Sequence, residues 1–404
     1  MLAELIGKHV LLLQGPVGPF FRRLADDLQR EDVRVTKVNL NAGDSLYFRG
    51  PEVVHYRGDF EQWGTWLTEL LRERGIDAVV LFGNRRRFHR VALDVAKTAD
   101  IPAYVFEEGY LRPDYLTLER GGVNGDSVMS RDPEFYRRLT LTDGRAPSSV
   151  GDSFWHLAWY SAGYSLALTL GASRYPRYRH HKDVHTVREG YRWARGGIRK
   201  LIWAQRDKHK LARLTGPWSG RYFLLPLQVH NDFQLEHSDF SSMSDFIRHV
   251  VASFAVHSPA DTYLVVKHHP MDRPYQDYTQ LLSELAEQHG LGPLGERLEY
   301  VADLHLPTLL RHARGTVLMN STVGFSSLHH ATPLKVLGRA IFDMEGLTHQ
   351  GELRDFWREP GTVDQDLYHR FRTWLEHNNQ ANGNFYKRLP DASNRAGVRW
   401  FEGS

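Results

Sequence analysis

Residues 76–106, IDAVVLFGNRRRFHRVALDVAKTADIPAYVF, decide the fold because they hold a strand, a helix and a second strand in succession. The apolar run at 76–84 is continuous, which is typical of a strand buried on both faces of a parallel sheet. Residues 86–100 predict a helix, and residues 101–106 predict the next strand. Strands that alternate with helices indicate a doubly wound parallel sheet.

The alternation begins at a strand over 9–15 and is interrupted once. Residues 151–218 predict helices rich in Trp, Tyr, Arg and His, and the alternation resumes with a strand at 221–229. We therefore expect two Rossmann-like domains that face each other across a central cleft, with a basic helical insertion between them. The expected segments are an N-terminal Rossmann-like domain at 1–150, a basic aromatic helical segment at 151–218, a C-terminal Rossmann-like domain at 219–375 and a helical tail at 376–404.

The composition is that of a globular protein, with 404 residues, 41% hydrophobic and 25% charged. The absence of cysteine excludes a disulfide framework, a thiolate zinc site and a cysteine nucleophile. The N-terminus, MLAELIGKHVLLLQGPVG, predicts a first strand better than a secretory signal. The longest apolar tract, residues 157–170, is too short and too polar to span a bilayer. We expect a soluble or peripherally bound protein.

Positive charge is concentrated in one segment. Residues 151–215 hold 9 Arg and 4 Lys against 3 Asp and 1 Glu, a net charge of +9, which leaves −6 for the rest because the whole chain carries +3. Trp and Tyr interleaved with these cations favour contact with anionic lipid headgroups. One alternative is a solvated basic face. Nucleic-acid binding is a weaker third, because no recognised motif accompanies the charge. The candidate membrane and acceptor contacts are Arg192, Arg195, Arg199 and Lys200.

Polar side chains cluster where the predicted strands end, which is where open parallel sheets bind ligands. The strand at 101–106 runs into Glu107 and Glu108, followed by Gly109 and Arg112. Side chains alternate along a strand, so the two acids start on opposite faces, and Arg112 is close enough to pair with one of them. The alternative is a surface turn held by a salt bridge.

The loop after the first strand, QGPVGPFF at 14–21, places two glycines between a strand and a helix. Close approach of a substrate to this backbone would make Gln14 and Gly15, together with Arg112, substrate-orienting residues. The alternative is tight packing of the strand against the helix.

Three strand ends in the second half carry candidate donor-site residues: two can bind an anion, and the third, QVHNDFQ, can hydrogen-bond a sugar or orient one carboxylate. QVHNDFQ offers a carboxylate among amides, KHHP a cation with imidazoles, and NSTVG hydroxyls at a helix start. The candidate residues are Gln228, Asp232, Gln234, Lys267, His269, Pro270, Asn320, Ser321, Thr322 and Gly324. The alternatives are an Asx-turn at Asp232, solvated loop histidines and a plain helix N-cap.

Other sites are disfavoured by the sequence. Acidic and histidine residues with metal-ligand spacing are not found, so we predict no metal site. A Walker lysine and a G-x-G-x-x-G pattern are both absent, which disfavours ATPase and dinucleotide-binding functions. Anion-binding strand ends in one domain and carboxylates in the other are the layout of a sugar transferase with a nucleotide-activated donor.

Six motifs in order resemble those of the KpsS/LipB-type capsule polysaccharide proteins, which are retaining β-Kdo glycosyltransferases. They are QGPVGPFF, EEGYLRPDYLTLERGGVN, PLQVHNDFQ, KHHP, NSTVGFSSLHHATPLKVLG and GLTHQGELRDFW. The likeness, from Gln14 to about Trp357, implies a GT-B-like fold, a CMP-β-Kdo donor and no cofactor or metal. It also implies an anionic lysophospholipid acceptor at the inner face of the bacterial cytoplasmic membrane, and a role in forming the poly-Kdo linker of a capsule beside other capsule assembly proteins.

The resemblance further implies individual roles. His269 and Pro270 match a motif that contacts the CMP phosphate, and Ser321 and Thr322 match its hydroxyl partner. The remaining donor-binding candidates keep the roles that their strand-end positions indicate.

Two carboxylates would carry the chemistry of this family. Asp232 matches the nucleophile, and Glu108, a glutamate where related proteins have aspartate, matches the acid/base. Glu107 is then the structural partner, with Arg112 as its counter-ion. Two successive inversions would give net retention.

Two other functions stay open at this point. One is a non-catalytic capsule assembly or export component that binds the nascent glycolipid. The other is a transferase of the same fold with a different donor, such as CMP-sialic acid or a UDP-sugar.

Overall fold

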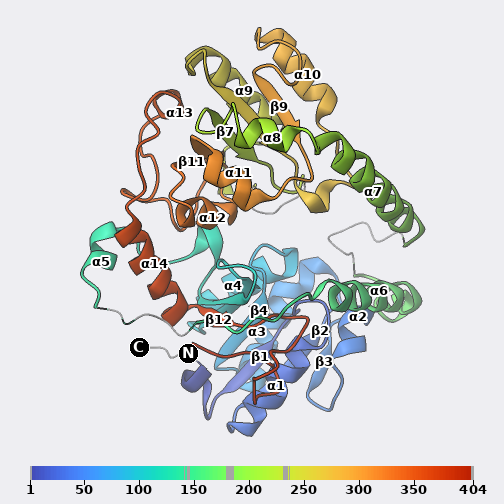
Figure 1. Ribbon diagram of the computed structural model, residues 1–404. Coiled ribbons are helices and arrows are strands. Elements are labelled where there is room, and N and C mark those ends of the chain that lie inside the picture. The colour runs from blue at the N-terminus through green and yellow to red at the C-terminus, as the bar shows by residue number, and fades with distance from the viewer. Residues whose placement is uncertain are drawn as a thin grey trace. The chain divides into compact units, whose positions relative to one another are not determined.

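The computed structural model describes residues 2–140, 142, 146–178, 186–230, 235 and 237–401. The chain divides into two compact units, each built on its own sheet (Figure 1). The N-terminal unit comprises residues 1–128, 142–186 and 373–404, and the C-terminal unit comprises residues 129–141 and 187–372.

A seven-stranded sheet forms the centre of the N-terminal unit, in the order β12-β6-β5-β4-β1-β2-β3. The first five strands along the chain are parallel, whereas β6 pairs antiparallel with β5 and β12 pairs antiparallel with β6. The strands are β1 (His9–Leu12), β2 (Arg34–Asn39), β3 (Val53–His55), β4 (Ala78–Phe82), β5 (Ala103–Glu108), β6 (Tyr115–Arg120) and β12 (Gln380–Asn382).

Helices cover both faces of this sheet because its central strands are apolar on both sides. Val10 and Leu12 of β1 pack in one buried cluster with α1, while Leu11 packs in a second cluster with α3 and α4. This two-sided burial is what a continuous apolar strand predicts. Helix α3 is capped by Gly75, whose left-handed φ of 59° is typical of a glycine C-cap. The helices are α1 (Phe20–Arg30), α2 (Ala42–Tyr47), α3 (Trp63–Arg74), α4 (Arg87–Thr98) and α6 (Phe154–Leu170), with short 3₁₀ turns η1 (Leu2–Leu5), η2 (Phe60–Gln62), η3 (Asn124–Asp126) and η4 (Ala172–Arg174).

The C-terminal unit holds a five-stranded, all-parallel sheet in the order β11-β10-β7-β8-β9. One face packs against α9 and α10, and the other against α8 and α11. The strands are β7 (Tyr222–Pro226), β8 (Tyr263–Lys267), β9 (Leu298–Val301), β10 (Gly315–Leu318) and β11 (Leu334–Val336). The helices are α5 (Pro133–Arg137), α7 (Thr186–Asp207), α8 (Lys210–Thr215), α9 (Met243–His257), α10 (Thr279–Gln288), α11 (Leu306–His312), α12 (Val323–His329) and α13 (Leu353–Phe356), with the turn η6 (Pro270–Asp272). Helix α14 (Gln365–Asn378) begins in this unit and continues into the N-terminal unit from residue 373.

Both sheets have Rossmann strand order. In each, the first strand is followed by two strands on one side, and the later strands lie on the other side, so the chain changes direction beside the first strand. These switch points lie between β1 and β4 and between β7 and β10, and ligands of such sheets bind there. The prediction of an α/β protein with two Rossmann-like parallel sheets is confirmed, and a GT-B-like cleft between the units stays a prediction.

The structure differs from the sequence interpretation at the ends of the predicted segments. The segment expected at 151–218 is divided, with α6 in the N-terminal unit and α7 and α8 in the C-terminal unit. A helical tail was expected from residue 376, but residues 373–404 belong to the N-terminal unit, where they form β12. In this segment the Phe385 ring packs edge-on against the Phe20 ring, with 4.9 Å between the ring centres. Within the described part of the chain, none of the helices has the length and apolar character to cross a membrane.

Candidate functional site

Glu107 and Glu108 are the last two residues of β5, opposite Thr117 and Leu116 of β6. The strand therefore continues two residues beyond its predicted end at Phe106, because β6 supplies an antiparallel partner. The pleat of the strand sends the two carboxylates to opposite faces, as predicted.

Glu107 lies in an environment that disfavours its charge. Burial raises the pKa of Glu107 to about 7. The hydrogen bond that Glu107 accepts from the Glu108 backbone N–H at 3.0 Å lowers this pKa and only partly offsets the effect of burial. The Glu108 carboxylate also raises this pKa, while the charges of Arg86 and Arg112 oppose the rise. Arg112 itself is exposed and donates from Nε to the Gly109 carbonyl at 3.2 Å.

Glu108 has a partner that its local sequence does not reveal. Its Oε1 accepts a hydrogen bond of 2.9 Å from the Tyr386 hydroxyl, in the returning C-terminal segment. Burial and the adjacent carboxylate raise the pKa of Tyr386 well above its usual value, so the phenol stays a donor. Gly109 is required beside it, since a Cβ there would lie 2.1 Å from the Tyr115 carbonyl oxygen.

Gln14 and Gly15 follow β1 at the N-terminal switch point, where both are held by neighbours. Gln14 Nε2 donates to the Tyr164 hydroxyl at 3.0 Å and to Asp44 at 3.1 Å. Arg86, just after β4, donates to Gln14 Oε1 and to the Gly15 carbonyl, each at 3.1 Å. Arg86 thus bonds the loop at 14–21, and its charge acts on Glu107 at the end of β5. The sequence did not reveal this role, because Arg86 reaches both groups only through the order of the strands in the sheet.

In the C-terminal unit, the predicted donor residues follow three adjacent strands. Gln228, after β7, donates from Nε2 to Asn320 Oδ1, after β10, at 3.1 Å. This hydrogen bond lies across the switch point of the sheet. Asp232 and Gln234 lie outside the described residues.

A histidine–aspartate pair joins the segments that follow β7 and β8 and was not predicted. His230 Nδ1 lies 2.5 Å from Asp272 Oδ1, and its backbone N–H donates to Asp272 Oδ2 at 3.2 Å. Asp272 is completely buried, and burial raises its pKa against the opposing effect of His230. The signal in the sequence was the position of Asp272 two residues after the His269-Pro270 motif.

The KHHP residues separate into a surface group and a core group. His269 Nδ1 accepts from the Met271 N–H at 3.2 Å, which leaves the proton of the neutral ring on Nε2. His268 is buried, its Nδ1 lies 2.6 Å from the Tyr300 hydroxyl, and burial lowers its pKa to about 3. Lys267 is also buried, bonds the Ala302 carbonyl at 3.3 Å and has a pKa lowered by burial to about 8. His269 and Pro270 are thus the members of the motif nearest to solvent.

The loop after β10 has the geometry of a helix start. Ser321 Oγ accepts from the Val323 N–H at 3.3 Å, and Thr322 occupies the N-cap of α12 without a side-chain capping bond. Gly324 allows close packing, since a Cβ there would meet the Phe342 ring at 2.3 Å. The loop thus offers short polar groups beside Asn320.

The arginines of α7 point at the segment after the His269-Pro270 motif. Arg199 donates to the Arg273 carbonyl at 2.8 Å and the Gln276 carbonyl at 3.1 Å, and Arg195 donates to the Pro274 carbonyl. The Arg192 guanidinium lies 5.3 Å from the centre of the Tyr275 ring, while Lys200 is exposed. These contacts brace residues 273–277, and the membrane contact predicted for the four cations stays a prediction.

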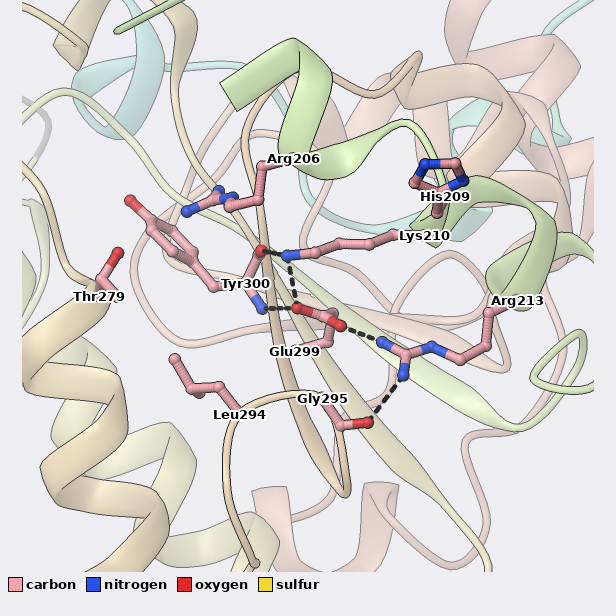
Figure 2. Close-up of a pocket in the computed structure, with 9 residues that line it drawn as sticks. All are labelled: Arg206, His209, Lys210, Arg213, Thr279, Leu294, Gly295, Glu299 and Tyr300. Carbon is pink, nitrogen blue, oxygen red and sulfur yellow. Dashed lines mark hydrogen bonds and ion pairs between the residues drawn. The ribbon is translucent and has the colours of Figure 1, made fainter. Parts of the chain in front are cut away.

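A pocket of about 470 Å³ opens beside β9, and its lining includes residues of α7, α8 and β9 (Figure 2). Buried Glu299 accepts from Lys210 at 2.8 Å and from Arg213, which fastens α8 to the edge strand. None of the predicted site residues lines this pocket. Across the described ranges, no group of three or more His, Asp or Glu is placed to hold a metal ion.

Comparisons with known proteins identify relatives over nearly the whole chain. The family model described as capsule polysaccharide biosynthesis protein matches residues 77–386. The chain is 39% identical over 391 residues to the capsule polysaccharide export protein KpsS of Escherichia coli, covering 95% of this chain and 98% of the relative. It is 38% identical over 390 residues to the capsule polysaccharide modification protein LipB of Neisseria meningitidis, covering 95% and 92%.

Among solved structures, the chain is similar to KpsC of Thermosulfurimonas dismutans, a β-Kdo 2,7 transferase. The TM-score is 0.43 at 13% identity, and the match covers 92% of each chain. The resemblance to KpsS and LipB expected from the motifs is confirmed by the family model and by the sequence relatives, and the chain belongs to the family of capsule polysaccharide biosynthesis proteins.

Proposed function

We propose that the protein is a retaining transferase that moves Kdo from CMP-β-Kdo to a lysophospholipid of the lysophosphatidylglycerol type and so starts a poly-Kdo linker. The observation that supports the proposal is the Gln228–Asn320 hydrogen bond across the C-terminal switch point, which joins two of the predicted donor residues. Membership of the capsule family supports the capsular setting.

On the donor side, His269 is the proposed ligand of the CMP phosphate. Because Nδ1 accepts from the backbone, the proton of the neutral ring is on Nε2, and a phosphate oxygen is a strong acceptor for an imidazole N–H. Pro270, Ser321, Thr322 and Gly324 would shape the same subsite. Lys267 is buried behind it and would act through its charge.

Asp232 is the proposed nucleophile, with His230 as an orienting neighbour two residues earlier. Asp232 would form a bond to the anomeric carbon as the bond from that carbon to the CMP phosphate breaks. His230, fixed by Asp272, would face the carboxylate of Kdo, whose negative charge an unshielded aspartate repels. Gln228 and Gln234 would hold sugar hydroxyls, and the proposal includes no metal or cofactor.

Glu108 is the proposed acid/base in the N-terminal unit. It would take the proton of the acceptor hydroxyl, which attacks the anomeric carbon and releases Asp232. Tyr386 orients Glu108. Glu107 is the second candidate for this role, because its pKa of about 7 suits proton transfer near neutrality.

The test measures CMP release and Kdo transfer by purified variants. Glu108→Gln and Asp232→Asn should each lower transfer by at least a hundredfold, whereas the exposed controls Glu69→Gln and Asp261→Asn should not. Wild-type transfer by a folded Glu108→Gln together with loss in Glu107→Gln would move the role to Glu107.

A second candidate function is a non-catalytic export component, which the name of the E. coli relative favours. Both functions would place the protein peripherally at the inner face of the cytoplasmic membrane, beside other capsule assembly proteins. Calorimetry with CMP, CMP-Kdo, CMP-sialic acid and a UDP-sugar separates the functions, because an export component would bind no nucleotide.

A further inference from the structure

Helix α6, residues Phe154–Leu170, has one face fixed to the protein. It packs on α2 of the same unit (Figure 1). The Tyr47 hydroxyl donates to the Tyr160 carbonyl at 2.7 Å, and a Cβ at Gly163 would lie 2.9 Å from the Tyr47 oxygen. This side of the helix is therefore anchored by close contact.

A second stripe of α6 is apolar and exposed. Trp155, Trp159, Leu166 and Leu170 are 75%, 77%, 56% and 76% exposed. Their spacings of four, seven and four residues place them on one stripe of the helix. The 17 residues of α6 include no Asp, Glu, Lys or Arg. A contiguous stripe of this kind on a soluble unit marks an interaction surface.

The sequence beside this stripe indicates the chemistry of its partner. Residues 171–185 hold four cations, Arg174, Arg177, Arg179 and Lys182, against the single acid Asp183. An apolar stripe that contains Trp and is followed in the sequence by a basic run is complementary to an anionic bilayer surface, where Trp lies at the headgroup level and Lys and Arg meet the phosphates.

Other occupants fit less well. A helix of 17 residues is about 25 Å long, shorter than the ~30 Å hydrocarbon core, so it cannot cross a membrane alone. The four exposed side chains offer roughly 600 Å², less than the ~800 Å² per partner of a stable protein interface. A helix that lies on a membrane surface needs neither the length to cross the bilayer nor the contact area of a stable protein interface.

We propose that α6 lies on the anionic membrane surface with Trp155, Trp159, Leu166 and Leu170 inserted at the level of the headgroups. The same helix reaches the candidate site from its other face. The Tyr164 hydroxyl accepts from Gln14 at 3.0 Å, and Gln14 is bonded to Arg86, whose charge acts on Glu107. The loop at 14–21, which carries Gln14 and which the proposed function places near the acceptor, would thus be linked to the membrane-facing helix. This link to the acceptor rests on the proposed function, whereas membrane docking itself does not.

The test is co-sedimentation of the full chain with vesicles of phosphatidylethanolamine and phosphatidylglycerol, without CMP-Kdo or acceptor. The wild type should bind, and binding should weaken at ~0.5 M salt, which screens the basic run. Trp155→Ser/Trp159→Ser should bind at least tenfold more weakly. Val256→Ser, a 70% exposed apolar residue of α9, is the matched control and should bind like the wild type.

Leu166→Ser/Leu170→Ser is a second variant for the case in which the first does not fold, as judged by thermal melting. The proposal is overturned if the wild type does not bind these vesicles, or if a folded stripe variant binds as tightly as the wild type. It is also overturned if light scattering shows a dimer that the stripe variants convert to a monomer without vesicle binding. Because no transfer is measured, failure here leaves the transferase proposal intact.

Discussion

Tyr386 donates a hydrogen bond of 2.9 Å to Glu108, although 278 residues separate them in the chain. The contact exists because β12 adds to the edge of the N-terminal sheet and carries the following segment past the end of β5. The candidate acid/base is therefore completed by the C-terminal part of the chain.

Tyr386→Phe should lower the Kdo transfer rate about 10- to 100-fold, because a hydrogen bond to a charged group contributes ~1.5–3 kcal/mol. CMP affinity should stay unchanged, since the donor candidates lie in the other unit. Steady-state kinetics and calorimetry measure the two effects. Tyr191→Phe, at an exposed site, is the control, and an unchanged rate in Tyr386→Phe would remove Tyr386 from the site.

Stability should depend on pH through Glu107. Its pKa rises from 4.5 to about 7 on folding, so the folded state binds more protons in this interval and stability falls as the pH rises from about 4.5 to about 7. Glu107→Gln removes this loss. The free energy of unfolding of the variant, taken relative to that of the wild type, should therefore rise by about 1–3 kcal/mol from pH 5 to pH 8. Urea unfolding at both pH values checks this. A difference between Glu107→Gln and wild type that does not change with pH would contradict it, and exposed Glu69→Gln should show no such change.

His230 and Asp272 should act as one unit. Asp272→Asn and His230→Gln should each lower kcat/KM for transfer by about 10–100-fold, and the double variant should lose little more, because both changes remove the same contact. The double-mutant cycle is the measurement, with circular dichroism as a check on folding. Fully additive losses would mean that Asp272 does not orient His230.

The arginines of α7 should affect the donor side. Arg199→Ala removes two hydrogen bonds to residues 273 and 276 and should weaken CMP binding severalfold and destabilise the protein by ~1–3 kcal/mol. The adjacent Lys200→Ala should change neither quantity, because Lys200 is exposed. Calorimetry and thermal melting measure these effects. Loss of vesicle binding in Arg199→Ala with normal CMP binding would favour the membrane role instead.

The sheets were predictable because buried parallel strands and amphipathic helices leave local patterns, as in residues 76–106. β6 and β12 were missed because both pair antiparallel, β12 has only three residues, and the pairing of the two joins Thr117 to Gln380. Pairings of this kind depend on the completed sheet, so no local signal encodes them.

The candidate site shows the same division. Strand ends located Glu107, Glu108, Gln228 and Asn320, since the carboxyl ends of parallel strands share an edge. Arg86 and Tyr386 were missed because their roles depend on partners far away in the sequence. The charge of α7 was visible, but the backbone carbonyls that Arg199 contacts were not.

The most direct test of the transferase proposal combines the purified protein with CMP-β-Kdo and lysophosphatidylglycerol and follows both products. We predict stoichiometric release of CMP and a Kdo-lipid whose linkage, by nuclear magnetic resonance, retains the β configuration. Intact CMP-Kdo and unmodified lipid after incubation with folded wild-type protein on vesicles would contradict the account.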